Sequence, residues 1–263
     1  MEIALGFAIA LAISLTGVGA GSMTTPLLIL LLGVPPAIAV GTALTFGAII
    51  KVIAVPAYVV RRQVSGRVLK YLLAGGIPGV IAGSFLLRSF KTSRYEGMLY
   101  GFLGILIVLT AGFHLYRTLR PPRMRPATDR SPLLPWLALP ISAEVGFSSA
   151  GAGALGSLAL FGFTKLAPAE VVGTDLCFGL IVSSIGSAMQ LTARNYDGAL
   201  LLQLVAGGIL GAVAGSLLAG RIAALPMRVT VLAMLVVLGM QLAVHGQTTP
   251  HPPLRAALHW TGR

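Results

Sequence analysis

Charged residues are scarce in this 263-residue chain. Asp, Glu, Lys and Arg make up 10% of it, against roughly 25% in a typical soluble domain, while 56% of the residues are apolar and 33 are glycine. A folded protein with so little polar surface cannot stay dissolved in water. The composition excludes an ordinary cytosolic enzyme and indicates a polytopic membrane protein.

Several motifs of catalysis and metal binding are also missing. The single cysteine, Cys177, lies inside an apolar run, which excludes a disulfide framework. There is no Walker phosphate loop, no Gly-x-Ser-x-Gly elbow and no His-x-x-x-His spacing. We therefore expect a protein that is not an enzyme and that holds no metal ion and no cofactor.

Acidic residues are fewer than basic ones, 7 against 19, and the net charge is +12. The cations fall between apolar runs, at 61–62, 88–94 and 117–130. This is where the positive-inside rule places charges in cytoplasmic loops, whereas binding to nucleic acid needs a basic face exposed to water. We expect no nucleic-acid partner.

Eight apolar runs are long enough to be membrane segments, since a transmembrane helix needs about 20 apolar residues. They cover residues 3–32, 37–60, 68–87, 96–117, 133–163, 170–191, 199–220 and 226–245. The predicted fold class is an all-α polytopic membrane protein.

The two halves of the chain are related by a shift of 132 residues. Gly19-Ala20-Gly21 falls on Gly151-Ala152-Gly153, and Val40-Gly41-Thr42 falls on Val172-Gly173-Thr174, in a register that needs no gap over about seventy residues. Such duplication is typical of transporters. The sequence predicts a first four-segment repeat at 1–117, a basic linker rich in Pro and Arg at 118–132, a second repeat at 133–246 and a disordered tail at 247–263.

Glycine interrupts the first and fifth runs, around 16–22 and 147–153. Each glycine inside a helix costs about 1 kcal/mol relative to alanine, and freed backbone groups in lipid must be buried or line a cavity. We expect these two runs to be broken or re-entrant. Matching interruptions in two repeats point to a transport site, although close helix packing also uses small residues.

Charge counting leaves the topology open. If every run crosses the membrane once, both termini lie in the cytoplasm and the basic residues divide 12 against 6 between the two sides. If the first and fifth runs are re-entrant hairpins, the repeats are inverted and the best division is again 12 against 6.

The sequence resembles the sulfite exporter TauE/SafE family over nearly its whole length outside the linker and tail. The residues that carry the resemblance are 15–22, 25–27, 33–42 and 166–175, with the Gly-Gly-x-x-Gly elements at Gly75 and Gly207. The second copy departs from the first where Ser149-Ala150-Gly151 replaces Gly17-Val18-Gly19. The resemblance implies a permease of bacterial or archaeal inner membranes for sulfite, sulfonates and related sulfur-containing anions.

Candidate site residues follow from the chemistry of a desolvated anion, which needs N–H donors, hydroxyls or a positive charge. Helix starts after the breaks offer amides, and threonines add hydroxyls. The predicted substrate-binding residues of this kind are Gly19, Ala20, Gly21, Ser22, Gly151, Gly153, Thr42 and Thr174.

Three ionisable residues lie within apolar runs. Lys51 is about nine residues from either end of its run, or ~13 Å deep, and is predicted to anchor the anion; snorkelling or a structural ion pair is the alternative. Asp175 and Glu144 are candidates for proton coupling or for an ion pair with Lys51. As an acid near a helix start, Asp175 could also have no further role.

We therefore expect a secondary transporter that exports small sulfur-containing anions by alternating access, with its site between the repeats near the two breaks. The alternatives are a transporter of another anion or of a metal ion, and a non-transporting membrane subunit. The expected partners are the anion, the lipid bilayer, a coupled proton and a second copy of the chain. The sequence leaves open the exact substrate, the coupling ion and the orientation.

Overall fold

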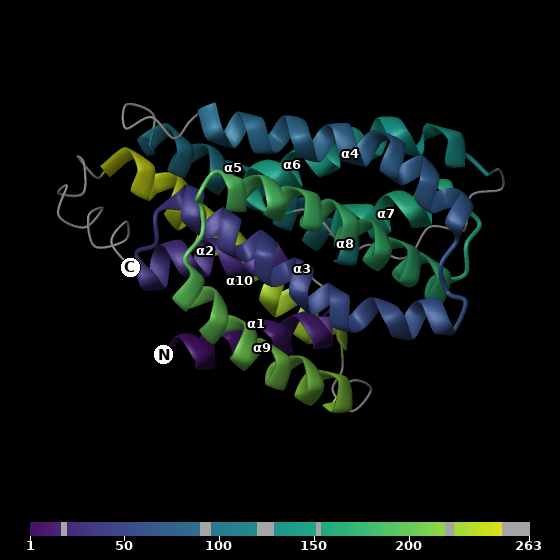
Figure 1. Ribbon diagram of the computed structural model, residues 1–263, viewed down its shortest axis with the longest axis horizontal. Coiled ribbons are helices and arrows are strands. Elements are labelled where there is room, and N and C mark those ends of the chain that lie inside the picture. Colours follow the sequence, from purple (N-terminus) through teal and green to yellow (C-terminus); the bar gives the residue numbers. More distant parts are fainter. Residues whose placement is uncertain (17–19, 90–95, 120–128, 151–153, 219–223, 249–263) are drawn as a thin grey trace.

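The computed structural model describes residues 1–16, 20–89, 96–119, 129–150, 154–218 and 224–248, and every regular element in these ranges is helical (Figure 1). The predicted all-α fold class is confirmed. Most of the predicted linker and tail, together with Gly19, Gly151 and Gly153, lies outside the described residues.

Ten α-helices and one 3-10 turn make up the described chain. They are α1 (Glu2–Thr16), α2 (Ala20–Leu32), α3 (Pro36–Val60), α4 (Gly66–Ser89), α5 (Glu96–Leu119), η2 (Ser131–Leu133), α6 (Leu134–Ser148), α7 (Ala154–Phe163), α8 (Pro168–Thr192), α9 (Gly198–Leu218) and α10 (Ala224–Thr248).

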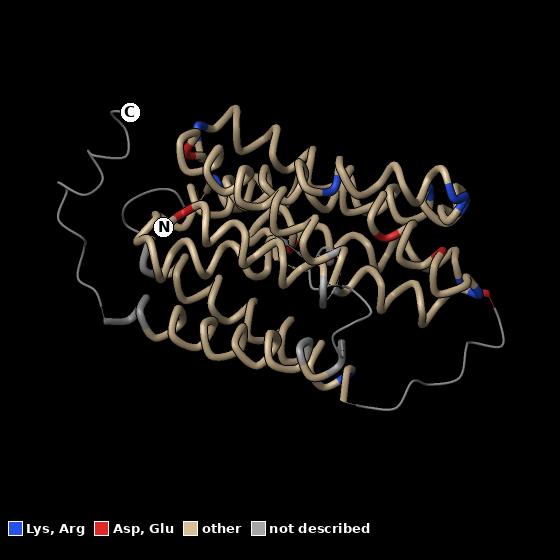
Figure 2. Tube along the Cα trace, turned by 90° about the horizontal axis from the view of Figure 1, so that it is seen from below, with Lys and Arg blue, Asp and Glu red and all other residues tan. Residues whose placement is uncertain are grey.

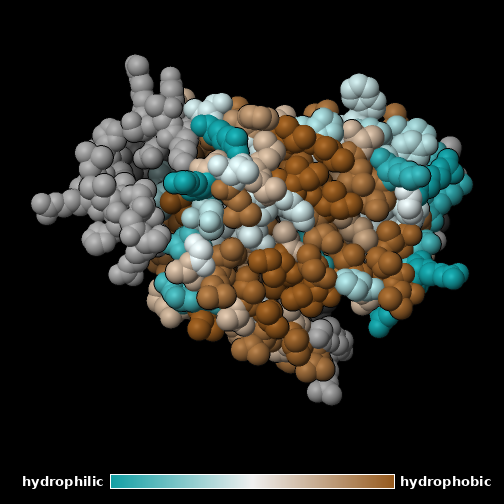
Figure 3. All heavy atoms as spheres, in the orientation of Figure 1, coloured by the Kyte–Doolittle hydropathy of each residue, from teal (hydrophilic) through white to brown (hydrophobic). Residues whose placement is uncertain are grey.

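Among the described residues, five helices are long and apolar enough to cross a membrane, namely 36–60, 66–89, 98–119, 168–192 and 198–215. Hydrophobic side chains cover the middle of the molecule (Figure 3), and most charged residues gather toward its two ends (Figure 2). This distribution is that of a multi-pass membrane protein, whose apolar belt faces lipid and whose charges face water.

Helix boundaries repeat in the second half of the chain. α1 begins at residue 2 and α6 at residue 134, α3 at 36 and α8 at 168, α4 at 66 and α9 at 198, so each pair is separated by 132 residues. Arg62 and Arg194, related by the same shift, both adopt left-handed backbone angles, with φ of 55° and 54°. The duplication seen in the sequence is therefore also a duplication of structure.

Both interrupted runs are divided in two. α1 and α2 share the first run, and α6 and α7 share the fifth. α6 ends at Ser148, and Ser149 follows with a φ of 60°. Both predicted breaks thus separate helices in the structure.

The central helices of the two repeats, α3 and α8, run in opposite directions. A Cβ on Gly41, near the start of α3, would lie 1.7 Å from the carbonyl oxygen of Asn195, just past the end of α8. Reciprocally, a Cβ on Gly173 would lie 2.1 Å from the carbonyl oxygen of Gln63, just past the end of α3. The repeats are therefore inverted relative to each other.

The sense of α1 follows from its packing on α9. Ile3 contacts Gly207 and Phe7 contacts Gly211, so these two helices run in the same direction. Because α9 is antiparallel to α8 (Figure 1) and α8 is antiparallel to α3, α1 runs with α3. α2 must bring the chain back between them, and the pair α1–α2 forms a hairpin that enters and leaves on one side.

Small residues make the contacts between repeats. A Cβ on Gly75 or Gly83 of α4 would meet the backbone of α6, and one on Gly207 or Gly211 of α9 would meet the backbone of α1, all within 2.2 Å of a carbonyl oxygen. The glycine rows on α4 and α9 therefore serve tight helix packing.

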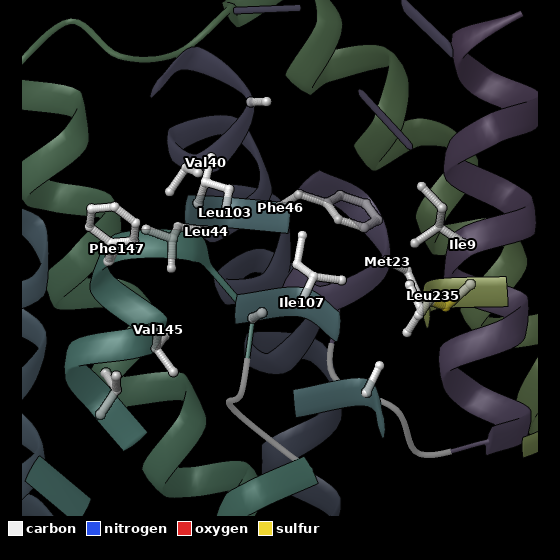
Figure 4. Close-up of a cluster of buried hydrophobic side chains, with 14 of the residues drawn as sticks. Ile9, Met23, Val40, Leu44, Phe46, Leu103, Ile107, Val145, Phe147 and Leu235 are labelled. Carbon is white, nitrogen blue, oxygen red and sulfur yellow. The ribbon is translucent and has the colours of Figure 1, made fainter. Parts of the chain in front are cut away.

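The buried core repeats the same reciprocity. Phe46 of α3 is fully buried against Gly208 of α9, and Phe178 of α8 is buried against Gly76 of α4. Figure 4 shows Phe46 and Ile107 among the apolar side chains of this core. Each central helix thus inserts an aromatic ring into the glycine face of the other repeat.

Cysteine labelling tests the inverted arrangement. Gly66 and Gly198 are exposed repeat mates at the starts of α4 and α9, where an added side chain meets nothing closer than 3.8 Å. In a Cys177→Ser background we expect a membrane-impermeant maleimide to label Gly198→Cys in intact cells, and Gly66→Cys only after permeabilisation. The links on the side of Gly66 hold 12 basic residues against 6 on the other side, which places Gly66 in the cytoplasm.

Because the two cysteine variants occupy equivalent positions in the two repeats, the difference in their labelling tests whether the repeats are inverted. If every apolar run crossed the membrane once, both positions would lie on the same side. Equal labelling of the two variants in intact cells would therefore contradict the inverted arrangement.

Substitution of the central glycines tests the α3–α8 contact. Gly41→Ala and Gly173→Ala each push a methyl group into a backbone carbonyl, and overpacking of this kind costs about 1–3 kcal/mol. We expect a lower unfolding temperature for both variants, measured on detergent-purified protein. Gly66→Ala, in open space, is the control and should unfold close to the wild-type temperature.

Candidate anion-binding site

Lys51 lies within α3 with 9% of its surface exposed. Its Nζ donates to Ser183 Oγ at 2.9 Å and to the Gly179 carbonyl oxygen at 3.3 Å, both on α8. Ser183 is the repeat mate of Lys51, 132 residues later. The ammonium group therefore lies where the two repeats meet, and it does not snorkel to a membrane surface.

Gly179 lies directly against the end of the Lys51 side chain. A Cβ at this position would lie 3.2 Å from Nζ and 3.3 Å from Cε of Lys51. The absence of a side chain lets the ammonium group approach the α8 backbone closely. One N–H of Lys51 is left without a partner in the described part of the chain, because an ammonium group has three donors.

Asp175 lies one helical turn before Gly179 and is 5% exposed. Its Oδ2 accepts a hydrogen bond from Ser157 Oγ of α7 at 2.6 Å, and its Oδ1 is buried without a hydrogen-bond partner among the described residues. Lys51 and Asp175 interact electrostatically, but among the described contacts they form no direct ion pair. The structure thus brings the two predicted charges to one part of the interface without joining them.

The two helix breaks also meet. Ser149, in the second break, donates from Oγ to the Gly21 carbonyl oxygen at 3.2 Å, and its Oγ lies 2.5 Å from Thr25 Oγ1 of α2. A Cβ on Gly21 would lie 1.8 Å from the Ser149 carbonyl oxygen, so this glycine permits the approach. Of the other residues predicted there, Ala20 begins α2 and Ser22 is partly buried in its first turn.

Asp175 links the charged pair to the second break, because its carboxyl group rests on the first turn of α7. A Cβ on Gly156 would lie 2.1 Å from Asp175 Oδ1. α7 begins at Ala154, directly after that break. Lys51, Asp175 and the two breaks therefore form one connected polar region inside the membrane part of the protein.

Thr42 and Thr174 are not part of this region. Thr42 Oγ1 accepts a hydrogen bond from the Asp197 amide at 3.2 Å, and Thr174 Oγ1 accepts one from the Ser65 amide at 3.0 Å. Asp197 and Ser65 directly precede α9 and α4. These two threonines hold the helix–helix links at the two ends of the α3–α8 pair.

Glu144 lies on α6 and faces Thr110 of α5. Its Oε1 is buried, and none of the described residues forms a hydrogen bond with it. The structure places this carboxyl group away from the α3–α8 contact that holds Lys51.

Sequence reasoning missed the hydroxyl groups that complete the region. Ser183 binds Lys51, Ser157 binds Asp175, and Thr45 Oγ1 lies 2.7 Å from Ser187 Oγ across the α3–α8 contact. The repeat register could have identified Ser183, which is the repeat mate of Lys51. A residue that lies near the symmetry axis between two repeats contacts its own mate. The other partners depend on helix positions that the register does not fix.

The chemistry of the region suits an anion. It offers one ammonium group, several hydroxyls and the single carboxyl group of Asp175. Within the described residues no group of three or more His, Cys, Asp and Glu is placed to hold a metal ion. A buried ammonium group with an open donor attracts an anion and repels a cation.

Comparisons with known proteins identify the chain as a membrane transporter. The chain is 28% identical over 249 residues to the Bacillus subtilis (strain 168) protein named "Probable membrane transporter protein YjnA", covering 91% of this chain and 98% of that protein. No solved structure matches the chain significantly. The family described as Sulfite exporter TauE/SafE matches residues 2–242. The chain therefore belongs to the sulfite exporter TauE/SafE family of membrane transporters.

Proposed function

We propose that this protein exports small sulfur-containing anions, sulfite or organosulfonates, across the cytoplasmic membrane of a bacterium or archaeon. The observation that carries the proposal is the buried Lys51, with an open N–H, between the inverted repeats. The family supports the substrate class and the direction.

A buried lysine is costly without a function, by ~2.5–3.5 kcal/mol at the centre of a membrane segment. The two hydrogen bonds to α8 offset part of this cost. An anion that shed its water to reach Lys51 would complete the third bond. A metal-ion transporter would need oxygen ligands free of a neighbouring cation, and a non-transporting subunit would need no such charge at depth.

Inverted repeats support alternating access as the mechanism. The same contact closes both ends of the α3–α8 pair, Gly41 with Asn195 at one end and Gly173 with Gln63 at the other. Opening one contact while the other holds would expose the site to one side at a time. A membrane potential that is negative inside favours efflux by about 2.3 kcal/mol per 100 mV for each net negative charge that crosses.

Sulfite flux into proteoliposomes tests the role of Lys51. We expect Lys51→Met to lower the flux roughly 10- to 100-fold, because a hydrogen bond to a charged group contributes about 1.5–3 kcal/mol and each 1.4 kcal/mol is a factor of ten. Lys70→Met, which removes an exposed lysine from α4, is the matched control and should keep wild-type flux.

The unfolding temperature, measured with and without sulfite, distinguishes a variant that no longer binds the substrate from one that no longer folds. Sulfite should raise the unfolding temperature of the wild type and of Lys70→Met, but not of Lys51→Met, since a ligand stabilises the state that binds it. Wild-type protein that folds but neither responds to nor transports sulfite or a sulfonate would remove the proposed substrate class.

The contact between Gly179 and Lys51 gives an independent test of the proposed anion site. Gly179→Ala crowds the Lys51 ammonium group at 3.2 Å, whereas Gly186→Ala, further along α8, meets only the side chains of Leu44 and Val80 at 3.3 Å. We expect about tenfold weaker sulfite binding in Gly179→Ala, measured as the sulfite concentration for half-maximal stabilisation, because the displaced ammonium group loses part of a charge-assisted bond. Similar weakening in both variants would show that packing of α8, and not the position of Lys51, controls binding.

A further inference from the structure

We infer that the anion binds at Lys51 together with a proton on Asp175, so that anion and proton cross the membrane as a pair. The inference rests on the proposed function and adds the identity and the location of the co-transported ion.

The first step is the spacing of the two groups along α8. Lys51 Nζ binds the Gly179 carbonyl oxygen, and Asp175 lies four residues before Gly179, about 6 Å along the helix axis. An anion on the open N–H of Lys51 would lie close to the Asp175 carboxyl group. Two negative charges at that separation repel strongly inside a protein, and a proton on Asp175 removes the repulsion.

The second step is the difference between the two carboxyl oxygens. Oδ2 accepts the hydrogen bond from Ser157, while Oδ1 is buried and has no hydrogen-bond partner in the part of the chain that the structure describes. A protonated Oδ1 can donate to an anion on Lys51, whereas an ionised one can only accept. The oxygen that would carry the proton is therefore the one left free.

The empty site keeps its charge balance without that proton. The carboxyl group rests on the first turn of α7, beside Gly156, where the partial positive charge of a helix start favours a carboxylate. Lys51 adds a full positive charge nearby. When an anion neutralises Lys51, Asp175 takes a proton from the water on the entry side and returns it to the water on the exit side; only an O–H bond forms and breaks.

Other charged groups around α8 do not replace this pair. α7 carries no titratable residue, Glu170 lies at the partly exposed start of α8 and accepts from the Ala167 amide, and Arg88 contacts Met189 and Thr192 at the far end of α8. The titratable groups on helices packed against α8 are Lys51 and Tyr58 of α3, Arg67, Lys70, Tyr71 and Arg88 of α4, and Glu144 of α6. Within the described chain, Lys51 is the charge that acts on Asp175.

A proton fits this site better than a metal ion. A sodium ion would need several oxygen ligands and would lie next to the Lys51 ammonium group, which repels it. In the first repeat the mate of Asp175 is Ala43, so the protein has one such carboxyl group and not a symmetric pair. The expected stoichiometry is one proton for each anion.

Infrared spectroscopy of protein labelled with carbon-13 aspartate tests the inference directly. The chain has three aspartates, at 129, 175 and 197. Adding sulfite to the purified wild type should produce the carbonyl band of a protonated aspartate. The band should also appear in Glu144→Gln and be absent in Asp175→Asn.

Binding measurements give a second readout. As pH rises above neutral, sulfite affinity should fall faster in the wild type than in Asp175→Asn, by about tenfold for each pH unit, because one proton is taken up on binding. The ionisation of sulfite itself affects both proteins equally and cancels in the ratio. If Asp175→Asn does not fold, Asp175→Ala, which copies the first repeat, takes its place.

The outcomes separate the inference from the proposed function. Stabilisation by sulfite without a new aspartate band, or with the same pH dependence in wild type and variant, overturns the proton inference and leaves anion transport standing. Failure of sulfite to bind or cross overturns both. A carbonyl band that the aspartate label does not shift, and that persists in Asp175→Asn but disappears in Glu144→Gln, would assign the proton to Glu144 and also overturn the inference.

Discussion

The antiparallel contact between α3 and α8 is the constraint on which the rest of the structure depends. It aligns the two repeats, and it does so through glycines that allow backbone to touch backbone at both ends of the pair. Thr42 and Thr174 then hold the links that lead into α9 and α4. Without this contact, Lys51 would lose its two hydrogen-bond partners on α8, and Asp175 would lose the nearby positive charge of Lys51.

The helix hairpins complete the interlocking of the repeats. α1 packs along α9 of the second repeat, and α6 packs along α4 of the first, so each hairpin is supported by the opposite half of the chain. This exchange satisfies a requirement of the membrane interior, where backbone freed at a break must be buried in protein. The break at Ser149 is buried against Gly21 and Thr25 in this way.

Much of this arrangement could be predicted from the sequence. The shift of 132 residues identified the repeats, the glycine-rich stretches located both breaks, and the glycine rows at Gly75 and Gly207 indicated tight packing. All of these are local patterns or direct matches between the halves. Lys51 could also be singled out from the sequence, because a charged side chain within an apolar run raises the free energy of membrane insertion.

The direction of the repeats and the partners of each polar group could not be predicted in the same way. The charge count was identical for both topologies, because the links that change sides between them carry equal numbers of basic residues: three at 165, 221 and 228 against three at 194, 255 and 263. The distinction came from the contacts of Gly41 and Gly173, which join positions more than a hundred residues apart. Thr42 and Thr174 illustrate the same limit, since their hydroxyls hold links and do not reach the breaks.

The position of Lys51 against its own repeat mate bears on how the gene could have duplicated. Two identical copies of the first half, assembled with the same symmetry, would bury one lysine directly against another, and two copies of the second half would bury aspartates with no lysine nearby. A homodimer of either half would therefore bury charges of one sign without the opposite charge nearby. Because the one cation and the one carboxyl group lie in different halves, neither half of the present chain could replace the fused protein as a homodimer of the same symmetry.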